Sequence, residues 1–131
     1  GAADIKREGK DVTVIATGKM VHEALAAAEE LAKEGLEVEV VDPRTLYPLD
    51  KKTIFDSIRK TNKAVVVTEE IKRGGYAGEI SAMISEEIFD SLDAPVVRLG
   101  ALNAPIPFST KLEQYMIPNS GDIIKGIKKL V

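Results

Sequence analysis

Residues 12–35 read VTVIATGKMVHEALAAAEELAKEG and contain the change of periodicity that decides the fold. The first five residues are almost continuously apolar and rich in β-branched side chains, which is typical of a strand covered on both faces of a parallel sheet. From residue 20 to residue 34 the apolar positions follow a helical period instead. They are Val21, Leu25, Ala28 and Leu31. Gly35 is a residue at which helices commonly stop, so this stretch predicts a strand followed directly by a helix.

The same alternation continues outward in both directions. Further strands are predicted at residues 3–7, 36–41, 64–68 and 95–99. Further helices are predicted after the N-cap Asp50, at residues 76–91, at residues 111–116 and after the N-cap Ser120. Alternating strands and helices predict an α/β fold, in which an open sheet is covered on both faces. In such sheets binding sites lie beyond the carboxyl ends of the parallel strands.

The composition excludes several classes of protein. The 131 residues fit one domain, with a net charge of −3, no Cys, no Trp and a single His. A Cys/His zinc site, an iron–sulfur cluster, a disulfide scaffold and a cysteine nucleophile are therefore excluded. The lack of basic excess argues against nucleic-acid binding, and no apolar run is long enough to span a membrane.

Without a signal peptide, a cytoplasmic protein is expected. The chain begins with Gly rather than Met, which predicts a domain excised from a longer protein.

The segment after the strand at residues 64–68 combines two acids with a glycine-rich turn. Glu69 and Glu70 are adjacent, so they point in opposite directions on an extended chain, and we expect structural ion pairs with Arg73 or Arg44. The glycines that follow are Gly74, Gly75 and Gly78. They indicate either a tight turn before a helix or an anion site at a helix N-terminus. Their spacing matches neither of the common phosphate-binding motifs.

Other candidate residues are isolated. His22 lies near the start of the first long helix without a Ser or Cys motif, which favours an exposed helix residue over a general base. Arg44 lies in a proline-stiffened connection at residues 42–50, and a second stiff, apolar connection covers residues 104–108. Arg44 is suited to binding a carboxylate. The residues by themselves therefore predict no catalytic constellation and no metal site.

Several segments, taken in order, resemble one family. They are KDVTVIATG at 10–18, MVHEAL at 20–25, VDPRTL at 41–46, PLD at 48–50, GG at 74–75 with GEI at 78–80, LDAPV at 92–96 and PIPF at 105–108. In this order they resemble the C-terminal domain of the beta subunit of thiamine-diphosphate-dependent 2-oxo acid dehydrogenases, which act in pyruvate, branched-chain and acetoin dehydrogenase complexes. The resemblance covers nearly the whole chain, and the Asp-Pro-Arg-Thr-Leu segment is most similar to the acetoin-cleaving branch.

The resemblance implies a fold and a role. The fold is the three-layer α/β/α transketolase C-terminal domain, with a five-stranded, mostly parallel sheet whose first strand is antiparallel. Thiamine diphosphate and Mg²⁺ lie between other domains of the enzyme, so residues 1–131 are expected to bind no cofactor or metal and to hold no catalytic residue. The domain helps to build an alpha-2-beta-2 tetramer, and an acidic face is expected to dock the basic peripheral subunit-binding domain of the acyltransferase core. Asp90, Asp93 and the carboxylate of Val131 are the candidates for this face.

Two alternatives stay open. One is a free-standing anion or nucleotide binder that uses the turn at residues 74–78. The other is the equivalent domain of transketolase or of deoxyxylulose-phosphate synthase, although the segments at residues 42–46 and 105–108 favour the dehydrogenases.

Overall fold

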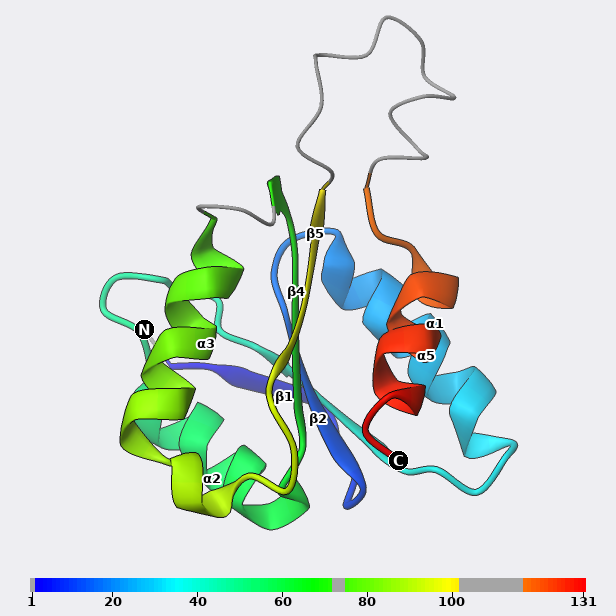
Figure 1. Cartoon of the computed structure of the whole chain (residues 1–131). Coiled ribbons are helices and arrows are strands. Elements are labelled where there is room, and N and C mark those ends of the chain that lie inside the picture. The colour runs from blue at the N-terminus through cyan, green and yellow to red at the C-terminus, as the bar shows by residue number, and fades with distance from the viewer. Residues whose placement is uncertain (1, 72–74, 102–116) are drawn as a thin grey trace, which may run out of the picture.

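The computed structural model describes residues 2–71, 75–101 and 117–131, which form one five-stranded sheet and its helices (Figure 1). The strands are β1 (Asp4–Arg7), β2 (Val12–Ala16), β3 (Val38–Asp42), β4 (Ala64–Ile71) and β5 (Val97–Ala101). The helices are α1 (Met20–Ala32), α2 (Lys51–Thr61), α3 (Tyr76–Glu87), the 3₁₀ turn η1 (Phe89–Ser91) and α5 (Ser120–Lys128). None of the helices in these ranges is long and apolar enough to cross a membrane.

The strand order is β1-β3-β2-β4-β5. β1 pairs antiparallel with β3, and the other neighbouring strands pair in parallel. This arrangement confirms the predicted mixed sheet with an antiparallel first strand. Helices α1 and α5 cover one face of the sheet, and α2 and α3 cover the other (Figure 1). The result is the three-layer α/β/α architecture that the sequence predicts.

The core consists of two apolar layers separated by the sheet. In β2, Val14 packs towards α1 and α5, whereas the next residue, Ile15, packs towards α2 and α3. Every residue of β2 is buried, as expected for a strand with helices on both sides. The predicted helical stripe is also confirmed, because Val21, Ala28 and Leu31 are buried against this sheet.

The ends of several elements differ from the prediction. β4 continues to Ile71, where it pairs with Ala101 of β5, so Glu69 and Glu70 belong to a strand and not to the predicted turn. α3 ends at Glu87 because the backbone of Ile88 leaves the helical region, with φ −134° and ψ 29°. β3 and β5 each begin two residues later than predicted.

The cap of the last helix is also corrected. The side chain of Asn119, not that of Ser120, caps α5: it accepts a hydrogen bond from the Asp122 amide, and the Asp122 carboxylate accepts one from the Asn119 amide. Asp50 caps α2 as predicted, by accepting from the Thr53 amide at 3.1 Å. The predicted helix at residues 111–116 and the connection at residues 104–108 lie outside the described residues.

A buried carboxylate joins β3 to its neighbours at the end of the sheet where the parallel strands begin. The side chain of Glu39 is 0% exposed and accepts hydrogen bonds from the Gly9 amide at 3.0 Å, from the Ser57 hydroxyl at 2.6 Å and from Lys60. Thr13 of β2 extends this network, since its hydroxyl lies 2.9 Å from that of Ser57. A Cβ added to Gly9 would lie only 2.4 Å from the backbone carbonyl carbon of Val38. The Gly9 backbone therefore approaches β3 closely enough to bond to Glu39 only because residue 9 is glycine.

Burial alone would raise the pKa of Glu39, but the hydrogen bonds from Lys60, Ser57 and Gly9 outweigh it and hold this pKa below its ordinary value. A carboxyl group whose folded-state pKa is lowered stabilises the fold above its unfolded pKa and loses that contribution as the pH falls through the folded value. Glu39→Gln should therefore lower the free energy of unfolding at neutral pH by about 1–3 kcal/mol.

The difference in the free energy of unfolding between the parent protein and Glu39→Gln should shrink as the pH is lowered through the acid range. Urea unfolding of both proteins at a series of pH values measures this, with the exposed Glu29→Gln of α1 as the matched control. Parallel stability curves for the parent and Glu39→Gln would show that the carboxylate contributes nothing through its charge.

Candidate functional site

The carboxyl ends of the parallel strands carry Glu69 and Glu70, and each carboxylate holds the start of a helix. Glu69 accepts a hydrogen bond from the Lys19 amide at the beginning of α1, at 3.0 Å. Glu70 accepts one from the Tyr76 amide at the beginning of α3, at 3.3 Å. Since α1 and α3 cover opposite faces of the sheet, the two adjacent side chains point in opposite directions, as strand alternation predicts. A negative charge at a helix N-terminus is stabilising because of the helix dipole.

The ion pair expected at this edge is not formed with Arg44, and with Arg73 it stays a prediction because that residue lies outside the described residues. Within the described residues, Glu69 and Glu70 bond to helix amides and not to Arg44. Arg44 is exposed, has a left-handed backbone with φ 63°, and donates its own amide to the Asp42 carboxylate at 2.8 Å. Two further candidates, Arg73 and Gly74, lie outside the described residues.

Two glycines at this edge allow close approach of other groups. Gly18 has φ +56°, and a Cβ added there would lie 2.6 Å from the Glu69 carboxylate. A Cβ added to Gly78 in the first turn of α3 would lie 3.1 Å from the Arg98 guanidinium of β5. Gly75 has an extended backbone and is the N-cap of α3. The predicted turn itself includes residues 72–74, which lie outside the described residues, so it stays a prediction.

The described part of this edge presents carboxylates where a diphosphate would need hydrogen-bond donors. The helix N-termini at which a phosphate would be stabilised already face Glu69 and Glu70, and a third carboxylate, that of Glu23, accepts from the Ser120 amide of α5 at 2.9 Å. No group of three or more metal-ligating side chains occurs in the part of the chain that the structure describes. His22 is exposed on α1, as its isolated position predicts.

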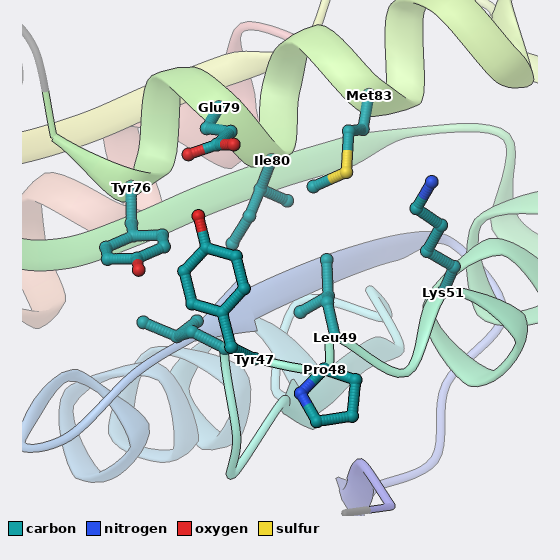
Figure 2. Close-up of a pocket in the computed structure, with 9 residues that line it drawn as sticks. Tyr47, Pro48, Leu49, Lys51, Tyr76, Glu79, Ile80 and Met83 are labelled. Atoms are coloured by element: carbon teal, nitrogen blue, oxygen red, sulfur yellow. The ribbon is translucent and has the colours of Figure 1, made fainter.

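A cavity of about 300 Å³ lies between the connection that follows β3 and helix α3 (Figure 2). It is lined by Leu46, Tyr47, Pro48, Leu49, Lys51, Tyr76, Glu79, Ile80 and Met83. The rings of Tyr47 and Tyr76 meet edge to face, with centroids 5.9 Å apart and planes at 67°. Desolvation raises the pKa of Tyr76, and the Tyr47 hydroxyl and the charges of Glu79 and Glu70 act in the same direction.

The sequence analysis did not predict this cavity, although the sequence pattern of one of its two walls is recognisable. Tyr76, Glu79, Ile80 and Met83 follow the spacing of a single helix face. The opposite wall belongs to residues 46–49, about thirty positions away in the chain, and no local pattern indicates that these two segments meet.

The candidate docking residues lie at the other end of the sheet. Figure 1 shows the C-terminus and the end of α3, with η1, at the end where the parallel strands begin. Asp90 and Asp93 are exposed, and the Asp93 carboxylate lies 3.3 Å from the Lys63 ammonium. Val131 is 55% exposed, and Phe89, which precedes Asp90, is 68% exposed.

The sheet order, the antiparallel first strand and the helix layers define a three-layer α/β/α domain. The family described as transketolase, C-terminal domain, matches residues 1–123, and the chain belongs to this family.

Similar proteins agree with this assignment. The chain is 47% identical to the beta subunit of acetoin:2,6-dichlorophenolindophenol oxidoreductase of Bacillus subtilis, over 100% of this chain and 38% of that protein. It is 44% identical to the 2-oxoisovalerate dehydrogenase beta subunit of the same organism, over 99% of this chain and 40% of that protein. A solved split-gene transketolase, an inactive beta4 tetramer, superimposes with a TM-score of 0.84 at 31% identity, over 98% of this chain and 40% of that chain. This chain therefore spans about two fifths of the length of these relatives.

The role of Glu69 as a cap can be tested by substitution. Glu69→Ala removes the acceptor for the Lys19 amide and the charge at the start of α1, and we expect it to lower the free energy of unfolding by about 1 kcal/mol. Glu69→Gln should recover part of this loss because an amide oxygen still accepts the bond. Denaturant unfolding measures both, with Glu29→Ala on the exposed face of α1 as the control. Equal stabilities of Glu69→Ala and Glu29→Ala would contradict the capping role.

Proposed function

We propose that this chain is the assembly domain of the beta subunit of a thiamine-diphosphate-dependent 2-oxo acid or acetoin dehydrogenase. One observation carries the proposal: the chain is 44–47% identical, over almost its whole length, to beta subunits of acetoin, 2-oxoisovalerate and pyruvate dehydrogenases. The identity to the transketolase-type structure is lower, 31%, which favours the dehydrogenases over transketolase. Either acetoin or pyruvate is the substrate that we propose for the complete enzyme.

In this proposal the chemistry takes place outside residues 1–131. Thiamine diphosphate and Mg²⁺ are held by the rest of the beta subunit and by the alpha subunit of an alpha-2-beta-2 tetramer in the cytoplasm. Two observations support this division. The chain spans about two fifths of its relatives, and its sheet edge presents Glu69 and Glu70 where a nucleotide-binding module would need to accept phosphate. The same carboxylates argue against the free-standing anion or nucleotide binder.

A domain exchange tests the proposed role. We expect this chain to replace the C-terminal domain of the Bacillus subtilis acetoin oxidoreductase beta subunit, with retained co-purification of the alpha subunit and retained reduction of the dye. The same exchange with Val14→Asp, which places a charge in the core, should abolish both.

Calorimetry of the 131-residue chain with thiamine diphosphate and Mg²⁺ should show no binding. Micromolar binding, or a well-folded exchange protein that fails to assemble, would contradict the proposal.

We further propose that the face around Asp90, Asp93 and the Val131 carboxylate docks the peripheral subunit-binding domain of the acyltransferase core. The exposure of these acids supports this, because acidic groups attract a basic partner and accelerate its association. The exposed ring of Phe89 beside Asp90 provides apolar area for the same contact.

Charge reversal on this face distinguishes docking from a solvated surface. In an assembled enzyme that carries this domain, Asp93→Lys should slow association with the subunit-binding domain and weaken its affinity, by about tenfold at low salt and less at high salt. Glu29→Lys, which makes the same charge change on α1, is the matched control. Surface plasmon resonance provides both rates. If the two variants bind equally at low salt, Asp93 has no part in docking.

A further inference from the structure

The cavity between residues 46–49 and α3 combines an apolar trough with a polar end. Figure 2 shows the Tyr47 ring between Tyr76 and Leu49, with its hydroxyl on the side of Glu79. Towards the other end, Leu49, Ile80 and Met83 face one another across the trough. A ligand that lies in this cavity therefore meets aromatic rings and a carboxylate at one end and an aliphatic channel along the rest.

The charges at the cavity favour a cation. Lys51 and Glu79 are the two charged residues in the lining, and the Lys51 ammonium is already bonded to the Glu87 carboxylate at 2.9 Å. Glu79 is exposed at the cavity, and the exposed Glu70, which is not part of the lining, accepts a hydrogen bond from the Tyr76 amide at the start of α3. Desolvation is the main cause of the raised pKa of Tyr76, and the negative charges of Glu79 and Glu70 add to it. An incoming positive charge would meet the Glu79 carboxylate and the aromatic rings of Tyr47 and Tyr76.

An arginine side chain has the shape and charge that this cavity requires. Its guanidinium is planar, stacks on aromatic rings and pairs with a carboxylate through two hydrogen bonds, whereas a lysine ammonium acts as a point charge. Its aliphatic stem is able to pack along an apolar wall while the charged end reaches a polar group. A purely apolar side chain would instead cover Glu79 without providing a partner, which is unfavourable.

We propose that this cavity is a docking site for an arginine side chain of a protein partner. The guanidinium lies against Tyr47 and Tyr76 and pairs with the Glu79 carboxylate, and the aliphatic stem lies along Leu49 and Met83. The site lies at the carboxyl end of the parallel strands, whereas Asp90 and Asp93 lie at the opposite end of the sheet, so it is separate from the docking face of the preceding subsection. The proposal stands on the geometry of the cavity and does not require the dehydrogenase role.

A peptide titration of the 131-residue chain tests this proposal. The probe is Ac-Ala-Arg-Ala-NH₂, and its counterpart with norleucine keeps the aliphatic stem without the charge. In ¹⁵N-edited NMR spectra, the arginine peptide should shift the amide signals of residues 46–51 and 76–83. Its millimolar affinity should exceed that of the norleucine peptide about fivefold, as expected for one exposed cation–aromatic contact with a carboxylate.

Two variants and a control assign the effect to this cavity. Glu79→Gln and Tyr47→Leu should each weaken binding of the arginine peptide about threefold to fivefold. Glu86→Gln makes the same charge change on an exposed residue of α3 that does not line the cavity, and it should leave the affinity unchanged. Since Glu79 and Tyr47 are exposed, both variants are expected to keep the fold, and their spectra show this directly.

Four results would overturn the proposal. Equal binding of the two peptides would indicate a pocket for an apolar side chain. Binding of guanidinium chloride as tight as that of the peptide would indicate a site for a small cation. Shifts at residues 46–51 that depend on protein concentration without peptide would indicate a contact between two copies of this chain. Equal effects of Glu79→Gln and Glu86→Gln would indicate nonspecific attraction to an acidic helix.

Discussion

The burial of β2 on both faces is the constraint on which the rest of the structure depends. All five of its residues are buried, and a strand in that position must have a helix layer on each side, since its alternate side chains point in opposite directions. α1 and α5 supply one layer, and α2 and α3 supply the other. The same constraint explains why β3 and β4 pair with β2 in parallel. Parallel strands need crossover helices, and these helices lie on the faces of the sheet.

A second feature of the fold is that carboxylates of the chain itself occupy the helix ends. Glu69, Glu70 and Glu23 accept from amides at the starts of α1, α3 and α5. In nucleotide-binding α/β proteins, helix ends at this edge of the sheet bind phosphate. Here the positive ends of the helix dipoles are used for the stability of the domain. This use of the helix ends agrees with the assembly role that we propose for the domain.

The two surfaces that we propose for partners lie at opposite ends of the sheet and differ in chemistry. The proposed docking face around Asp90 and Asp93 has exposed carboxylates and the exposed ring of Phe89, which suit a basic partner through charge attraction. The end around Tyr47 and Tyr76 is hollowed, which suits a single inserted side chain. The assembly role that we propose for this domain requires separate contact surfaces of this kind, because each neighbour approaches from its own direction.

The sequence by itself determined the layers of this protein, because the period of apolar residues within a strand or a helix is a local property. Val12 to Ala16 and the stripe that contains Val21 and Leu31 needed no other part of the chain to be recognised. Element ends were less well predicted: the extension of β4 to Ile71 depends on pairing with Ala101, a contact thirty residues away. Only the tertiary structure decided that Glu69 and Glu70 bond to helix amides and that residues 46–49 face α3. Those partners are distant in the chain, and sequence spacing carries no information about which of several available donors or side chains the fold brings within reach.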